Sequence, residues 1–260
     1  THPYISTGLT GNKFGIPHTE ALAAYQQAAA LAGLHVVGID CHIGSQITEI
    51  APYLDAAARL LDVVELVEAA GIALPHIDFG GGLGIAYNGE TPPAADALCQ
   101  QILALLDARG MGQRQLVFEP GRSLVGNAGV CVTEVLYLKH GQSKNFCIVD
   151  AAMNDLPRPA MYQAYHQIVP LEQSAAAQAS TYDVVGPVCE SGDWLGNERR
   201  LSVQQGDLLA VMSAGAYCMS MASNYNSRAR AAEVLVADGQ VHLIGEREPF
   251  AALVQRERML

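Results

Sequence analysis

Three short apolar runs dominate the first half of the chain, because they recur at an almost constant spacing. They contain Val36, Ile77 and Val117, which lie 41 and 40 residues apart. Between them, the segments 52–70 and 93–109 carry apolar residues at three- and four-residue steps, the pattern of amphipathic helices. A regular alternation of strands and helices predicts parallel strands, with helices that cover the sheet.

A different pattern begins after Arg122. Helical periodicity largely disappears, and short β-rich runs separated by turn-forming residues take its place. We therefore expect two domains, with the strand and helix units in residues 1–124 and an antiparallel β-barrel or β-sandwich in residues 125–260. The strands expected in the second domain are 129–138, 145–150, 181–188, 208–211, 232–236 and 241–244.

The segments outside these patterns also have predicted structures. Good helix formers over 20–32, followed by Gly33, predict a helix before the first strand. Residues 1–17 are expected to form a loop or a strand end. Tyr162 and the alanine-rich stretch 174–180 are expected on loops or short helices.

The middle apolar run ends in a glycine-rich loop, with glycines at positions 80, 81, 82 and 84. Backbone without side chains can approach a ligand closely, and bare N–H groups can bind an anion such as a phosphate. A tight turn is the simpler alternative, but it does not require four glycines. The dinucleotide-binding pattern G-x-G-x-x-G matches no frame here, which argues against a doubly wound sheet.

The other two runs in the first half also end in residues suited to chemistry. The segment 42–45 follows the first run, and the segment 119–122 follows the third. Functional groups of β/α barrels collect at the carboxyl ends of the strands. A β/α barrel therefore fits the pattern. Three β-α units are too few to close an eight-stranded barrel, so either the missing strands precede Thr1 or the first half is not a barrel.

Composition excludes several classes of function. A net charge of −11 with only 15 Lys and Arg argues against nucleic acid or an anionic membrane surface as partner. No apolar run is long enough to span a bilayer and no signal peptide is visible, so a cytoplasmic location is expected. The six cysteines are scattered without a C-x-x-C pair, which predicts free thiols and no metal site.

Five separated motifs occur along the chain in a characteristic order. They are 42–45, 80–84, 119–122, 189–193 and 215–217. With these motifs the chain resembles the pyridoxal-phosphate-dependent basic amino acid decarboxylases of the alanine-racemase fold, over essentially its whole length. The runs 152–162 and 223–228 look most like the branch of that family that converts meso-2,6-diaminopimelate to L-lysine and carbon dioxide.

The resemblance implies pyridoxal 5'-phosphate as cofactor and assigns residues to it. His42 would pack on the ring and take part in catalysis. Glu119 would pair with the protonated ring nitrogen, which lets the ring accept electrons. The other residues implied in cofactor binding, mostly around the phosphate, are Ser45, Gly80, Gly81, Gly82, Gly121, Arg122 and Tyr217.

The resemblance also assigns the substrate side. Arg122, Arg158 and Tyr162 would clamp the distal carboxylate of the substrate, and Tyr217 would also contact the substrate. Glu190 would recognise the distal amino group. Cys189 would act as the catalytic acid that protonates the carbanion after carbon dioxide leaves. In this family the Cys189 and Glu190 pair reaches into the neighbouring subunit's site, which implies a homodimer with shared active sites.

The sequence departs from the family at one important residue. The family holds its cofactor covalently through a lysine on an early barrel strand, whereas this chain has only Lys13, Lys139 and Lys144, none in such a context. We therefore expect about 150 residues of the family pattern to precede Thr1. Residues 1–124 would then be the last three β-α units of a partial (β/α)8 TIM-type barrel.

Other interpretations stay open at this point. Taken singly, His42 could be a structural histidine and Cys189 an inert thiol. A related decarboxylase of D-ornithine or D-lysine shares most motifs, although Arg158 and Tyr162 favour the dicarboxylic substrate. A truncated, inactive homologue with a binding or regulatory role is the third interpretation, and the intact pair of Cys189 and Glu190 argues against it.

Overall fold

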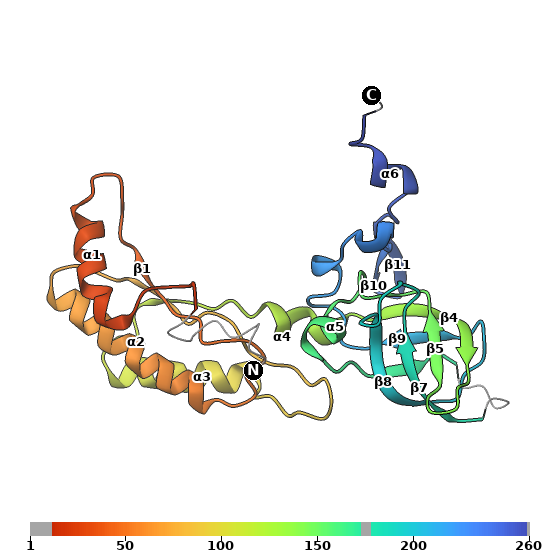
Figure 1. The fold of residues 1–260 in the computed structure, drawn as a ribbon. Coiled ribbons are helices and arrows are strands. Elements are labelled where there is room, and N and C mark those ends of the chain that lie inside the picture. Colours follow the sequence, from red (N-terminus) through yellow and green to blue (C-terminus); the bar gives the residue numbers. More distant parts are fainter. Residues whose placement is uncertain (1–11, 173–177, 259–260) are drawn as a thin grey trace. The chain divides into compact units, whose positions relative to one another are not determined.

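The computed structural model describes residues 12–172 and 178–258, which form two compact units, 1–124 and 125–260 (Figure 1). Each unit has a hydrophobic core of its own. Most of the loop expected over 1–17 lies outside the described residues, as do residues 174–177 of the alanine-rich stretch.

The first unit contains a three-stranded parallel sheet in the order β1-β2-β3, which confirms the predicted parallel pairing. The strands are β1 Gly38–Asp40, β2 His76–Asp78 and β3 Gln115–Val117. The register places Asp40 opposite Asp78, and Asp78 opposite Val117. The three strands therefore end level with one another, and the loops that follow them leave from the same edge.

The helices of this unit are α1 Ala21–Ala30, α2 Ala51–Ala69 and α3 Ala95–Ala108, with a short 3-10 helix at His18–Glu20 before α1. Figure 1 shows α2 and α3 side by side, and they contact each other. The predicted apolar stripes are confirmed, because Leu61 and Val64 of α2 and Ile102 and Leu106 of α3 are fully buried, together with Ile77 of β2.

The second unit contains a six-stranded sheet in the order β6-β9-β4-β5-β7-β8. Its strands are β4 Cys131–Lys139, β5 Phe146–Val149, β6 Ile168–Pro170, β7 Ser180–Val185, β8 Trp194–Leu201 and β9 Leu208–Val211. The edge strands β6 and β8 contact each other, because Gly196 leaves room for the side chain of Ile168. The sheet therefore curls until it is nearly closed.

The sheet is mainly antiparallel, as expected, but one pair of strands is an exception. β5 and β7 run parallel, whereas the other neighbouring strands of this sheet pair antiparallel in the described residues. The reason is the connection: after β5 the chain forms α5 Arg158–Tyr162 and β6 before it returns as β7. Parallel neighbours need such a crossover, because a tight hairpin turn joins only antiparallel strands.

Two strands, β6 and β8, were not predicted from the sequence. β8 contains Glu198, Arg199 and Arg200 in succession, so it lacks a simple alternation of apolar and polar residues. Pairing with β7 makes this segment a strand despite its composition. Tyr162 lies in the short helix α5, as expected.

A separate hairpin, β10 Glu233–Ala237 and β11 Gln240–Gly245, matches the last two predicted runs. Asp238 and Gly239 form its turn with positive φ values, as tight hairpins require. The remaining short α-helices of the described residues are α4 Gly121–Val125 and α6 Phe250–Val254, and further 3-10 helices lie at Gly126–Ala128, Met219–Met221 and Tyr225–Ser227. All six cysteines are free thiols, and none of the helices in the described ranges has both the length and the apolar character needed to cross a membrane.

Candidate functional site

The glycine-rich loop of the first unit packs directly against the backbone of the two neighbouring strand ends. A Cβ atom at Gly80 would lie 2.5 Å from the carbonyl oxygen of Cys41, and one at Gly81 would lie 2.2 Å from that of Glu119. A Cβ at Gly82 would lie 2.2 Å from the carbonyl oxygen of Gly44. Only glycine fits at these positions, so the loop is more than a tight turn.

Hydrogen bonds join the loop after β1 to the glycine-rich loop. The N–H of Ile47 donates to Gly82 O at 2.9 Å, and the N–H of Gly84 donates to Ile47 O at 3.0 Å. The side-chain amide of Gln46 donates to Ile85 O at 2.6 Å and accepts from Ile85 N at 3.2 Å. Sequence analysis missed Gln46, although its position beside the 42–45 motif was a signal.

His42 has a fixed orientation and a fixed tautomer. Its Nδ1 atom accepts the N–H of Gly81 at 3.2 Å. Because a peptide N–H can only donate, Nδ1 carries no proton in this contact. The N–H of Gly80 donates to Asp78 Oδ1 at 2.8 Å. Two amides of the loop are thus engaged within the protein, whereas they were expected to be bare, and a ligand would have to use other donors.

Three carboxylates lie near the ends of the parallel strands. Burial, followed by the charges of Asp78 and Glu119, raises the pKa of Asp40. The field around Asp40 is therefore negative. It suits a positively charged group such as a protonated ring nitrogen.

Arg122 lies close to Ser45. This guanidinium is buried, with 6% of the residue exposed, and its Nη2 donates to Ser45 Oγ at 2.8 Å. Its Nη1 donates to the hydroxyl of Tyr87 at 2.6 Å. Because Ser45 accepts this hydrogen bond, its own hydroxyl proton can point to another acceptor. A buried cation beside a hydroxyl donor suits an anionic ligand. Sequence analysis did not single out Tyr87.

In the second unit, Cys189 and Glu190 are adjacent residues on an exposed turn between β7 and β8. The buried carboxylate of Asp193 holds this turn, because it accepts the N–H of Val188 at 2.8 Å and the N–H of Met153 at 2.7 Å. The N–H of Asp193 donates to Glu190 O at 3.0 Å. Asp193 lies within the predicted motif, but its role as a brace was not predicted.

We expect Asp193→Asn to lower the free energy of unfolding of the whole protein by about 2 kcal/mol, because an amide nitrogen cannot accept an N–H and a hydrogen bond to a charged group is lost. Denaturant unfolding measures this change. The matched control is Asp238→Asn, at an exposed hairpin turn where asparagine tolerates the positive φ. Equal stability of the two variants would contradict the proposed brace.

Arg158 and Tyr162 lie four residues apart in α5, so they share one face of this short helix. Arg158 is buried, and its Nη1 lies 2.8 Å from His166 Nε2. His166 Nδ1 lies 2.8 Å from Met212 O, and a carbonyl can only accept. Nδ1 therefore carries the proton and Nε2 accepts from Arg158, which makes His166 neutral. Sequence analysis missed His166.

Tyr217 lies on the loop after β9 and is 43% exposed, with a φ of 58°. The preceding Gly215 packs tightly, since a Cβ there would lie 1.8 Å from Val125 O. The N–H of Gly215 donates to Gly126 O at 3.0 Å. The loop backbone around Tyr217 is therefore held by the first residues of this unit.

The predicted site residues thus gather in a few places within each unit. In the first unit, the ends of the three strands bring together His42, Ser45, Gly80, Gly81, Gly82, Glu119, Gly121 and Arg122. In the second unit, Cys189 and Glu190 share one turn. Arg158 and Tyr162 share one helix, and Tyr217 lies on a loop of its own.

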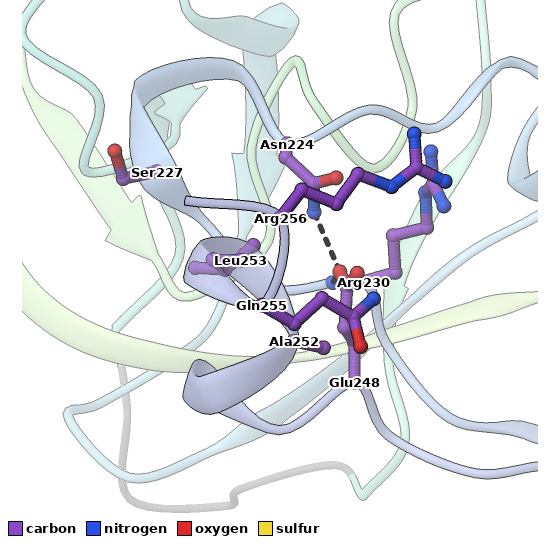
Figure 2. A pocket seen from close by; sticks show the side chains of 8 residues that line it. All are labelled: Asn224, Ser227, Arg230, Glu248, Ala252, Leu253, Gln255 and Arg256. Atoms are coloured by element: carbon purple, nitrogen blue, oxygen red, sulfur yellow. Dashed lines mark hydrogen bonds between the residues drawn. The ribbon is translucent and has the colours of Figure 1, made fainter. Parts of the chain in front are cut away.

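Figure 2 shows a pocket of the second unit, between the segment 224–230 and α6. No predicted site residue lines it. Its lining residues are Asn224, Ser227, Arg230, Glu248, Ala252, Leu253, Gln255 and Arg256. Within the described parts of the chain, no cluster of three His, Cys, Asp or Glu side chains could hold a metal ion.

Comparisons with known proteins give a consistent result. The family described as pyridoxal-dependent decarboxylase, pyridoxal binding domain, matches residues 1–126. The diaminopimelate decarboxylase of Vibrio cholerae is 51% identical, and the match covers 100% of this chain and 62% of that protein. The diaminopimelate decarboxylase of Pseudomonas aeruginosa is 53% identical, with the same coverage of both chains.

Solved structures give the same result. The crystal structure of diaminopimelate decarboxylase from Helicobacter pylori complexed with L-lysine has a TM-score of 0.90 and 39% sequence identity. The similarity covers 98% of this chain and 63% of that one. The chain thus spans 62% of the length of the two curated relatives.

Proposed function

This chain belongs to the pyridoxal-dependent decarboxylases, and from that premise we propose that the whole protein converts meso-2,6-diaminopimelate to L-lysine and carbon dioxide. The observation that carries the proposal is the match to diaminopimelate decarboxylases, in which about half of all residues are identical along the entire chain. The chain also has, at the positions expected from the resemblance, side chains suited to both ends of this substrate.

The two units correspond to two proposed domains. Residues 1–124 would be the C-terminal part of a pyridoxal-phosphate-binding β/α barrel, and residues 125–260 the C-terminal β domain. The level ends of the three parallel strands support the first assignment. The curled six-stranded sheet supports the second.

The residues at the strand ends fit pyridoxal phosphate. When bound, this cofactor withdraws electrons from the reacting carbon of an amino acid. The charge of Glu119 acts close to Asp40 and suits a protonated ring nitrogen, and His42 has a fixed orientation in which to pack on the ring. Ser45 and Arg122 suit the phosphate. The space beside Gly121 is open, because a Cβ there would meet no atom within 4 Å.

The second unit supplies the groups proposed for the substrate and the proton. Arg158 and Tyr162 would bind the distal carboxylate, because a guanidinium group matches carboxylate geometry. Glu190 would bind the distal ammonium. Cys189 would deliver a proton to the carbon that has lost carbon dioxide.

A homodimer is part of the proposal. The turn that carries Cys189 and Glu190 is exposed, so it is accessible to a neighbouring subunit. A shared active site would use this turn from one subunit at the strand ends of the other.

A substrate comparison on the whole protein tests the proposal. We expect release of carbon dioxide and L-lysine from meso-diaminopimelate, and at most slow release of carbon dioxide from D-ornithine or D-lysine. Arg158 and Tyr162 have a distal carboxylate to bind in the first substrate, whereas D-ornithine and D-lysine have no distal carboxylate. Activity on ornithine alone would overturn the proposal.

A further inference from the structure

Glu190 has a hydrogen-bond partner that the proposed function does not use. The hydroxyl of Tyr225 donates to Oε2 of the Glu190 carboxylate. Tyr225 lies in a short 3-10 helix, Tyr225–Ser227, far from Glu190 in the sequence. We propose that Tyr225 is a positioning residue, which holds Glu190 in place to receive the distal ammonium of the substrate. This inference rests on the function proposed above.

The segment around Tyr225 is held by residues near the end of β5. The N–H of Ser223 donates to Asn154 O at 2.9 Å, and the side-chain amide of Asn154 donates to Ser223 O at 3.3 Å. Arg228 Nε donates to Asn154 Oδ1 at 2.8 Å. Asn154 is 1% exposed, so these bonds are shielded from water. Tyr225 therefore extends from a fixed support.

The turn that carries Glu190 is attached to the same support. Met153, the neighbour of Asn154, donates its N–H to the carboxylate of Asp193, and the N–H of Asp193 donates to Glu190 O. The backbone near Tyr225 and the backbone of Glu190 are thus both attached to the short segment 153–154. Their contact follows from the fold of this unit, and a mobile surface pair would lack such anchors.

A second attachment holds the Tyr225 segment from its other side. The side-chain amide of Asn224 donates to Glu248 Oε2 at 2.5 Å, the bond drawn as a dashed line in Figure 2. Glu248 Oε2 also accepts the N–H of Arg230 at 3.0 Å. Asn224 also donates to Arg228 O at 3.0 Å. The residue next to Tyr225 is therefore anchored independently of Asn154.

The chemistry of the pair suits recognition of an ammonium group. A carboxylate accepts several hydrogen bonds, so Glu190 can bind the phenol and still accept from an ammonium. The bond to Glu190, followed by its charge, raises the pKa of Tyr225, so the phenol keeps its proton and stays a donor at neutral pH. A carboxylate held in place before the ligand arrives loses less side-chain entropy on binding.

Two ligands that differ by one amino group test the inference on the whole protein with its cofactor. L-lysine carries an amino group beside its carboxylate, and 6-aminohexanoate is the same molecule without that group. Titration calorimetry measures both dissociation constants. We expect Tyr225→Phe to weaken L-lysine binding roughly tenfold, as for one lost hydrogen bond to a charged group, and to leave 6-aminohexanoate binding unchanged.

The controls separate a positioning role from a structural one. Tyr137→Phe, at an exposed tyrosine of β4, should change neither dissociation constant. In a Glu190→Gln background, Tyr225→Phe should have little further effect, because the two residues act as a unit. Equal weakening of both ligands by Tyr225→Phe, or no weakening of either, would overturn the inference alone. A wild-type protein that binds neither ligand would overturn the proposed function as well.

Discussion

Gly81→Ala is expected to destabilise the whole protein and to weaken its cofactor binding or activity strongly. The added methyl group would lie 2.2 Å from the carbonyl oxygen of Glu119, which is backbone and cannot rotate away. Relief of this clash must move the glycine-rich loop away from the end of β3. The movement would also break the hydrogen bond from Gly81 N to His42 Nδ1. Glu119 and His42, which are proposed to contact the cofactor ring, would therefore both be displaced.

The expected size of this effect has two parts. Overpacking should lower the free energy of unfolding by about 3 kcal/mol. Displacement of the ring contacts by about 1 Å should weaken cofactor binding or activity roughly a hundredfold. Denaturant unfolding measures the first part, and the absorbance of bound pyridoxal phosphate during titration measures the second.

The matched control is Gly33→Ala. A Cβ there meets nothing within 4 Å, and the backbone at Gly33 does not have a positive φ. This variant should match the wild type in stability and in cofactor affinity. Wild-type cofactor affinity in Gly81→Ala would show that the close packing at the strand ends is not needed for the proposed site.

Cys189→Ala is also expected to have a large effect, and it should act on the rate of reaction. Alanine has no proton to deliver to the carbon that has lost carbon dioxide. A well-placed acid of this kind contributes about a hundredfold to ten-thousandfold, so kcat should fall by that factor. KM should change little, because Glu190 and Arg158 are still present to bind the distal end of the substrate.

Steady-state kinetics on the whole protein measures this prediction. The turn that carries Cys189 is exposed, so its substitution should leave the thermal unfolding temperature unchanged. Cys99→Ala, on α3 of the first unit, is the control and should retain normal kcat. Normal kcat in Cys189→Ala would assign the proton to another group.

Local pattern was enough to predict the elements of the first unit. The three- and four-residue repeat over 52–70 predicted α2, which runs over Ala51–Ala69, because one face of a helix must be apolar to be buried. The even spacing of the apolar runs predicted parallel strands. The glycines and the charged residues after the strands predicted which side chains would meet at the strand ends.

Local pattern was not enough for the second unit. The charged segment that forms β8 carries no strand signal, and it is a strand because β7 offers hydrogen bonds to its backbone. The parallel pairing of β5 and β7 depends on the path of the chain between them. Both features arise from pairing between distant segments, which the order of nearby residues does not encode.

The site residues could also be predicted from the sequence, whereas the residues that hold them in place could not. Residue type and motif pointed to His42, Cys189, Glu190 and Arg158, because their chemistry is visible in the sequence. The residues that hold the site segments in place are Gln46, His166, Asp193 and Tyr225, and these roles were found only from contacts in the folded chain. The physical reason is that a short-range repeat records which face of an element is buried, whereas a hydrogen-bond partner is chosen by which distant segments the fold brings within about 3 Å.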